Sequence, residues 1–221
     1  MILSSGLIQK RLEQSGTDSS GLHIVPAPQI NTQSDSASVD LRLGCWFTTF
    51  RVTQTSHFSA YSDAQKLVTS DQAAQQALTA KSGNRQEKSE YIPFGSRFVL
   101  HPGQFTLAVT LEWLRMPHDL CAYVSARSSW ARYGLLLATA TGVHPGFAGC
   151  LTLELSNIGV MPIELLPGTA ICQLFLHSVE GPTQPGFRDS RFVGNRRPVV
   201  PPVAIDPILR MLMAPDSGWQ P

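Results

Sequence analysis

Short apolar segments separated by proline-glycine pairs recur through residues 91–177, and they constrain the fold more than any other feature of the chain. The segments are rich in β-branched, aromatic and aliphatic residues, as in FTLAVTLEWL and CLTLELSN. Turn signals stand between them at Pro102-Gly103, Pro145-Gly146 and Pro167-Gly168. Strands of about four to eight residues at this spacing predict an all-β barrel or sandwich with little helix.

Two segments near the N-terminus carry further secondary-structure signals. Residues 4–14 predict a short helix capped by Ser4 or Ser5. Residues 38–51, SVDLRLGCWFTTFR, alternate polar with apolar side chains and predict a pair of strands around Gly44. The aromatic residues of this segment are expected to pack in the core or at an interface: Trp46, Phe47 and Phe50.

The remaining segments predict one domain followed by a tail. Residues 59–90 are rich in Gln, Ala, Ser and Lys, which indicates an insertion or mobile loop with room for one helix over 70–80. Residues 182–221 contain eight prolines and predict an extended tail with one short helix over 208–213. We therefore expect a β-domain over residues 1–181 and a tail that can fold over a ligand.

Composition limits the partners that the protein can have. The 221 residues are 43% hydrophobic and carry 17 basic and 16 acidic side chains, so a globular domain with no strong overall field is expected. Neither a nucleic acid nor a membrane is predicted as a partner, and an anionic ligand needs a local cluster of charge. Because no apolar run reaches about 18 residues and no signal peptide is evident, we expect a cytoplasmic protein.

The cysteine and histidine residues form no metal motif. The four cysteines are widely spaced among apolar neighbours, which favours reduced core thiols over a disulfide framework: Cys45, Cys121, Cys150 and Cys172. Neither HExxH nor the HxE and PCxxC pattern of zinc-dependent nucleobase deaminases occurs, so no metal ligands are predicted. His101 and His118 are expected in turns.

A cluster of guanidinium and hydroxyl groups lies in ARSSWAR. Arg127, Ser128, Ser129 and Arg132 fall within six residues. The planar guanidinium donates paired, charged hydrogen bonds that suit phosphate oxygens. The alternative is a helix N-terminus with solvated charges.

Glu154 is a single carboxylate within an aliphatic run. Burying an ionised carboxylate is unfavourable, so such a residue is usually exposed or functional. The alternation of CLTLELS places the leucines on one strand face and Glu154 on the other, so an outward-facing surface residue is the alternative.

Six blocks in this order resemble the dCTP deaminases of the dCTP deaminase and dUTPase superfamily. The blocks are SVDLRLG at 38–44, HPGQF at 101–105, ARSSWARYGL at 126–135, TA at 139–140, HPGFAGCLTLEL at 144–155 and LPGTAICQL at 166–174. The resemblance implies a distorted jelly-roll barrel of the dUTPase-like type. It also implies a homotrimer with active sites at the subunit interfaces, closed by the C-terminal segment.

The resemblance implies hydrolytic deamination of dCTP to dUTP and ammonia, without zinc and with Mg²⁺ carried on the nucleotide phosphates. The family's catalytic glutamate falls on Glu154, which would act as the general base that activates water. Ser128 and Arg132 match the residues that line the reaction centre and stabilise developing charge. The backbone carbonyl of Ala140 would orient the water.

The remaining site residues also follow from the resemblance. Arg127 and Ser129 match phosphate-binding positions, and the strand at Thr152 and Leu153 would face the base through its backbone. In the tail, two residues occupy the places where the deaminases usually show a lysine and a glutamine that hold the triphosphate: Arg191 and Asn195.

His144 departs from the superfamily pattern, which usually has an acidic residue in this slot of the substrate site. In the dUTPases and bifunctional enzymes that acid activates water at the α-phosphate. Its replacement by histidine predicts a weak or missing diphosphatase activity, although an imidazole can act as a base. Two alternatives to a dCTP deaminase stay open: a nucleotide-binding paralogue or regulator without turnover, and a dUTP diphosphatase or bifunctional deaminase.

Overall fold

A computed structural model describes residues 1–15, 21–31, 36–51, 87–140, 142–181 and 194–200. Residues 1–51 and 87–199 belong to one compact unit, and of the second unit only Val200 is described. The helices expected over 70–80 and 208–213 lie outside the described residues, as do Arg191 and most of the predicted tail.

The described part of the first unit is built almost entirely of antiparallel strands. Its helices are α1 Ser5–Ser15 and α4 Ser128–Ala131. Its strands are β1 His23–Val25, β2 Val39–Phe50, β3 Glu87–Tyr91, β4 Phe98–Leu100, β5 Phe105–Arg115, β6 Leu120–Ala126, β7 Leu135–Leu137, β8 Gly142–Val143, β9 Ala148–Asn157, β10 Ile163–Leu165 and β11 Ala170–Ser178. The all-β prediction is confirmed.

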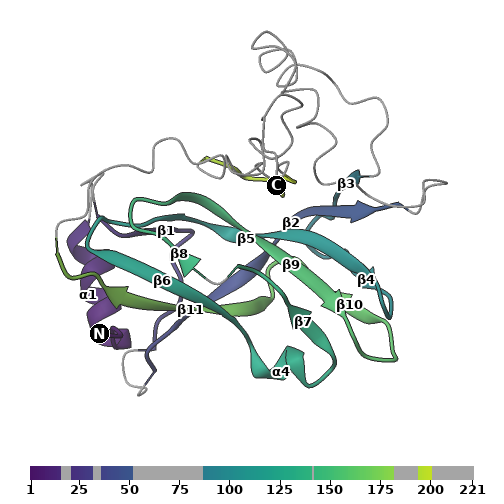
Figure 1. Ribbon diagram of the computed structural model, residues 1–221, viewed down its shortest axis with the longest axis horizontal. Coiled ribbons are helices and arrows are strands. Elements are labelled where there is room, and N and C mark those ends of the chain that lie inside the picture. Colours follow the sequence, from purple (N-terminus) through teal and green to yellow (C-terminus); the bar gives the residue numbers. More distant parts are fainter. Residues whose placement is uncertain (16–20, 32–35, 52–86, 141, 182–193, 201–221) are drawn as a thin grey trace, which may run out of the picture. The chain divides into compact units, whose positions relative to one another are not determined.

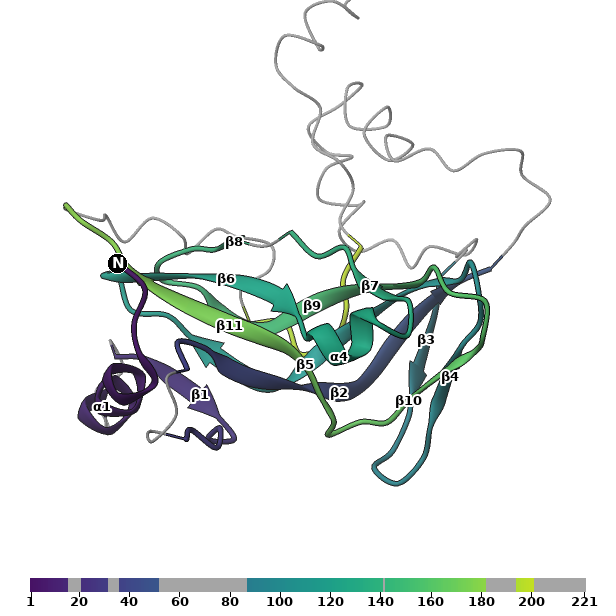
Figure 2. The same cartoon turned by 90° about the horizontal axis from the view of Figure 1, so that it is seen from below.

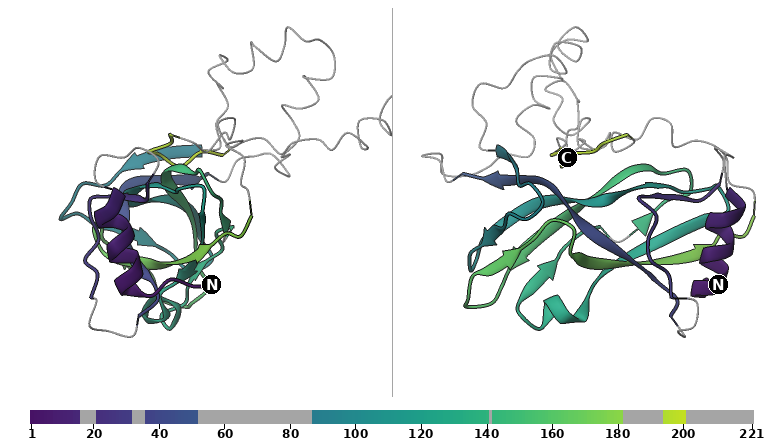
Figure 3. Two further views of the ribbon diagram at one scale, coloured as in Figure 1. Left: turned by 90° about the vertical axis from the view of Figure 1, so that its left-hand side faces the viewer. Right: turned by 180° about the vertical axis from the view of Figure 1, so that it is seen from behind.

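One nine-stranded sheet contains most of these strands in the order β7-β9-β5-β2-β11-β6-β8, with β1 added to β5 and β3 added to β2. The strands β4 and β10 form a separate ribbon (Figure 1). Figure 3 shows, end-on, that the large sheet curls round a common interior. Since the path ends at β7 and β8, the barrel is open between these two strands.

Alternation along the strands fills the interior of the barrel. On β9 the side chains of Leu151, Leu153 and Leu155 are buried, whereas the residues between them are half-buried. This is the period of two expected for a strand with one face toward a core. Phe47 on β2 is fully buried and stacks on Phe98, with ring centroids 4.5 Å apart.

The N-terminal helix α1 begins and ends one residue later than predicted. Its Ile8 is fully buried in the core cluster, which anchors the helix to the barrel. Figure 2 shows α1 at one end of β11 and α4 at the other. None of the helices among the described residues is long and apolar enough to cross a lipid bilayer.

The strand pair predicted around Gly44 is wrong, because β2 runs through this glycine as one strand of 12 residues. A Cβ at Gly44 would lie 3.0 Å from the carbonyl oxygens of Val109 and Thr110 on β5. The register between β2 and β5 also shifts between Leu43 and Phe47. Gly44 therefore permits a close approach of two backbones at a bulge, and it does not form a turn.

The three Pro-Gly turns are confirmed. Gly103, Gly146 and Gly168 have φ values of 73°, 76° and 91°, in the left-handed region that favours glycine. His101 and His118 also lie at turns: the backbone N–H of Gln104 donates to the His101 carbonyl, and His118 lies in the turn between β5 and β6.

All four cysteines are free thiols, as predicted. Cys45, Cys150 and Cys172 are buried, and Cys121 is half-buried. Burial raises the pKa of the Cys172 thiol to about 12. Of the aromatic residues of β2, only Phe47 lies fully in the core, while Phe50 is partly exposed and stacks on Phe105.

Candidate active site

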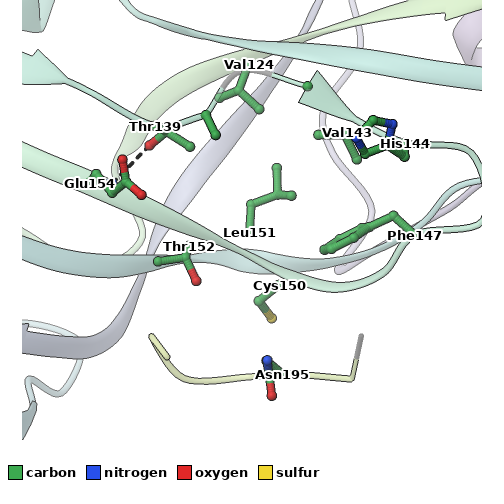
Figure 4. Close-up of a pocket in the computed structure, with 12 residues that line it drawn as sticks. Val124, Thr139, Val143, His144, Phe147, Cys150, Leu151, Thr152, Glu154 and Asn195 are labelled. Atoms are coloured by element: carbon green, nitrogen blue, oxygen red, sulfur yellow. Dashed lines mark hydrogen bonds between the residues drawn. The ribbon is translucent and has the colours of Figure 1, made fainter. Parts of the chain in front are cut away.

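A cavity of about 370 Å³ lies where the barrel is open, between residues of β6 and β8 on one side and of β9 on the other. Apolar side chains form part of its lining: Val124, Val143, Phe147 and Leu151. It brings together five of the predicted site residues: Ala140, His144, Thr152, Glu154 and Asn195. Figure 4 shows Glu154 and His144 on opposite sides of Leu151.

Glu154 projects from the face of β9 that does not face the core. Its backbone is held by the segment after β7. The N–H of Glu154 donates to Thr139 Oγ1 at 2.9 Å (Figure 4). The Glu154 carbonyl accepts from the Ala138 N–H at 2.8 Å. Burial raises the pKa of the Glu154 carboxyl above the usual value. The predicted alternation is therefore correct, but at this position the outer face opens into a cavity and not simply to solvent.

Within the part of the chain that the structure describes, the edge of β9 beside this cavity is only partly paired. At one end Gly194 N–H donates to the Ala148 carbonyl and Cys150 N–H donates to the Asn195 carbonyl, at 2.7 and 2.9 Å. At the other end the segment after β7 holds Glu154. Along a strand the backbone N–H and C=O of every second residue point to the same edge. Ala148, Cys150 and Glu154 bond at this edge, so the N–H and C=O of Thr152 point to it as well, between Cys150 and Glu154. The side chain of Leu153 lies in the core.

The described part of the tail reaches the cavity through Asn195. Two residues further on, the Arg197 guanidinium lies 3.8 Å from the centroid of the Trp46 ring. Such a cation–π contact stabilises by about 0.5–1 kcal/mol at an exposed site. Sequence reasoning did not identify this contact, which joins the tail to β2.

A second cavity, of about 320 Å³, holds part of the Arg-Ser cluster. Arg127 and Ser129 line it together with Trp130, Tyr133, Thr169 and Ala170. Arg127 stands at the N-cap of α4, yet its side chain makes no capping hydrogen bond. The cluster therefore does begin a helix, as the alternative predicted. The guanidinium of Arg127 is not simply solvated, however, because it pairs with Asp40 at 2.7 Å.

Ser128 in α4 and Arg132 directly after it are exposed, and neither lines one of the two cavities. Within one chain, the structure thus separates the Arg-Ser cluster from the cavity that contains Glu154.

A protein-family model described as dCTP deaminase-like matches residues 2–179. The chain belongs to this family.

Similar proteins in the dCTP deaminase-like family span nearly the whole chain. A "dCTP deaminase, dUMP-forming" of Dictyoglomus turgidum is 36% identical over 212 residues, 93% of this chain and 96% of the relative. The protein of the same description from Methanobrevibacter smithii is 31% identical over 210 residues, again 93% and 96%. A "dCTP deaminase" of Natronomonas pharaonis is 35% identical over 202 residues, 90% of this chain and 92% of the relative.

The fold is also similar to a solved structure. The 2'-deoxycytidine 5'-triphosphate deaminase of Agrobacterium tumefaciens matches with a TM-score of 0.52 and 19% identity, over 79% of this chain and 46% of that chain. At this identity the likeness supports the barrel fold alone.

One buried carboxylate of this dCTP deaminase-like chain was missed by sequence reasoning. Glu112 on β5 is fully buried, and its Oε1 accepts from Arg42 Nε at 2.6 Å while Oε2 accepts from the Arg42 backbone N–H at 2.8 Å. The signal was present, since Glu112 is a lone carboxylate in FTLAVTLEWL just as Glu154 is in its own strand. Among the described residues, no group of three or more His, Cys, Asp or Glu side chains is placed to hold a metal ion.

Proposed function

We propose that this protein is a deaminase that hydrolyses dCTP to dUTP and ammonia for thymidylate supply. The single observation that carries the proposal is Glu154, whose pKa is raised by burial, in a cavity bordered by the open edge of β9. Membership of the dCTP deaminase-like family supports the same reaction.

The proposed reaction uses Glu154 as the general base and no zinc. Its ionised carboxylate takes a proton from a water molecule that the Ala140 carbonyl orients, and the water oxygen forms a bond to C4 of cytosine. As this bond forms, the C4=N3 double bond becomes single and its electron pair moves to N3. The tetrahedral intermediate then expels the amino group, which takes the proton from Glu154 and leaves as ammonia. The remaining hydroxyl proton passes to N3 as the C4=O bond forms. A carboxyl with a raised pKa suits both proton transfers: it is a stronger base toward the water, and as the acid it can donate the same proton to the leaving amino group. The product carries oxygen at C4, so dCTP and water become dUTP and ammonia.

The proposed site is completed by a second subunit of a homotrimer. Charge that develops at C4 needs nearby donors, and the candidates Ser128 and Arg132 lie away from the cavity in the single chain. A neighbouring subunit can supply them, together with Arg127 and Ser129 for the phosphates of the magnesium-bound nucleotide. The open edge at Thr152 would read the base through its backbone groups. A cytoplasmic location stays a prediction.

The contact between Arg197 and Trp46 is expected to hold Asn195 in the cavity. Arg197→Ala removes the cation–π contact and is expected to raise the KM for dCTP by about two- to fivefold, equivalent to about 0.5–1 kcal/mol. Arg51→Ala serves as a control that removes an exposed arginine at the end of β2. Steady-state ammonia release measures both variants, and an unchanged KM in Arg197→Ala would contradict the role of the contact.

The activity is expected to fall in acid as Glu154 becomes protonated. Because burial raises the pKa of this carboxyl above the usual 4.5, the acidic limb of kcat/KM should lie above that pH. The stability effect has the opposite sign: a raised folded-state pKa stabilises the fold while the group is protonated, and this contribution is lost as the pH rises through the folded pKa. A profile of kcat/KM against pH measures this acidic fall. A midpoint of the fall at or below pH 4.5 would show that Glu154 is not the base.

A bifunctional enzyme that ends at dUMP is the second candidate. The names of the Dictyoglomus and Methanobrevibacter relatives favour it, whereas His144 in the slot of the expected acid favours dUTP as the end product. Incubation of the purified protein with dCTP and magnesium, with ammonia, dUTP, dUMP and pyrophosphate followed together, tests both. Binding of dCTP without ammonia would indicate a regulator, and pyrophosphate with dUMP would indicate the bifunctional enzyme.

A further inference from the structure

Asp40 on β2 is tied to Arg127 through the outer face of the barrel. Its Oδ2 accepts from Arg127 Nη1 at 2.7 Å, and the two side chains are 40% and 35% exposed. Residues 40 and 127 are 87 positions apart in the sequence. The pairing of β11 with both β2 and β6 brings them together, because Gln173 lies opposite Asp40 on one side and opposite Ser125 on the other.

The carboxylate of Asp40 is itself held in place. Gln173 Nε2 lies 3.2 Å from Asp40 Oδ1 and 3.3 Å from Ser38 Oγ, so it donates toward both acceptors. The hydrogen-bonded row thus runs from Ser38, just before β2, through Gln173 on β11 and Asp40 on β2 to Arg127, just after β6. Because Gln173 holds Oδ1 of Asp40, Oδ2 is presented to Arg127 in one direction. The ion pair then limits the rotamers that the Arg127 side chain can adopt.

Arg127 lines the cavity of about 320 Å³, together with Ser129, while Asp40 is not part of the lining. The carboxylate takes one donor of the guanidinium, Nη1, from a residue that is not part of the lining, and it does not use the other donors. A guanidinium has five N–H donors, so it can bind an anion and Asp40 at once.

We propose that Asp40 is a positioning residue, which orients Arg127 toward the phosphates of the nucleotide. The proposal rests on the proposed function, in which Arg127 contacts those phosphates. Asp40 touches neither the base nor the reacting atoms, so its removal should act on substrate binding and leave the chemical step unchanged. The same reasoning gives Gln173 a smaller effect of the same kind.

The test compares Asp40→Asn with wild type in the full chain, using dCTP with magnesium as the probe. Binding is measured by calorimetry and turnover by ammonia release. We expect the Kd and KM to rise about three- to fivefold with kcat unchanged, the range of a half-exposed ion pair. Gln173→Met removes the donor to Asp40 and Ser38 but leaves the ion pair of Asp40 with Arg127, so it should give a smaller rise. Asp119→Asn is the matched control, since it removes a pair with Arg11 of the same 2.7 Å length and similar exposure outside both cavities.

A double-mutant cycle separates positioning from a general structural effect. In an Arg127→Ala background, Asp40→Asn should leave the Kd unchanged, because the group that it orients is gone. An equal rise of the Kd in that background, or a fall in kcat at constant KM, would overturn the inference.

The inference and the proposed function can fail separately. Ammonia release by wild type with an unchanged Kd and KM in Asp40→Asn would overturn the inference alone. Weaker binding of dCTP by Asp40→Asn with no ammonia from wild type would support the inference and overturn the deaminase. If wild type does not bind dCTP, both are overturned.

Discussion

Replacing Glu154 with glutamine is expected to lower kcat for ammonia release from dCTP by about 10²- to 10⁴-fold, the usual contribution of a general base. The amide keeps the size of the side chain but cannot accept a proton from water. The Kd for dCTP should change little, since the backbone of β9 and not this side chain is proposed to read the base. Single-turnover ammonia release with calorimetric binding measures both quantities.

Glu164→Gln provides the matched control for this substitution. Glu164 also projects from a strand, β10, but it is exposed and pairs with Arg97 at 2.8 Å. It lies in neither cavity, so wild-type kcat is expected. The fold of Glu154→Gln should be retained at neutral pH, because ionised Glu154 is disfavoured by burial in the folded state. A variant that keeps more than a tenth of wild-type kcat would show that another group activates the water.

Replacing Arg42 with methionine is expected to lower the free energy of unfolding by about 3 kcal/mol. The substitution removes the guanidinium from Glu112 and leaves a carboxylate that is fully buried. The backbone N–H at position 42 still donates to Glu112, so the loss should lie at the lower end of the range for a broken buried pair. Urea unfolding measures it as a lower midpoint at an unchanged m-value.

Two further variants make this stability prediction specific. Arg97→Met breaks a pair whose side chains are 65% and 53% exposed, and it should change the stability by about 1 kcal/mol or less. Adding Glu112→Leu to Arg42→Met removes the unpaired charge and should recover most of the loss. Arg42→Met within about 1 kcal/mol of wild type would mean that water or another donor reaches Glu112.

Much of the barrel could be predicted because its signals are local. The Pro-Gly turns need a left-handed glycine, and the alternation of CLTLELS needs only a period of two, so both can be read from a few neighbouring residues. Gly44 shows the limit. A glycine in a strand pattern is compatible with a turn or with a close approach of another backbone, and only the position of β5 decides between them.

The candidate site divides in the same way. Resemblance to the dCTP deaminases identified Glu154, Ala140, His144, Thr152 and Asn195, which the structure brings to one cavity. The row from Asp40 to Arg127 was not predicted, because it depends on which strands are neighbours of β11. Neither was the contact of Arg197 with Trp46, which joins residues far apart in the chain.

Glu112 and Glu154 carry the same local signal, a single carboxylate in an aliphatic strand, and the sequence by itself determined that each needs a compensating environment. Only the tertiary structure decided which environment each one has. Arg42, 70 residues away, neutralises Glu112 because β2 lies beside β5. Glu154 lies where the edge of β9 is open, so its charge is left for chemistry in the cavity. Long-range pairing of strands sets this difference, because the local pattern of side chains does not specify which strand lies alongside.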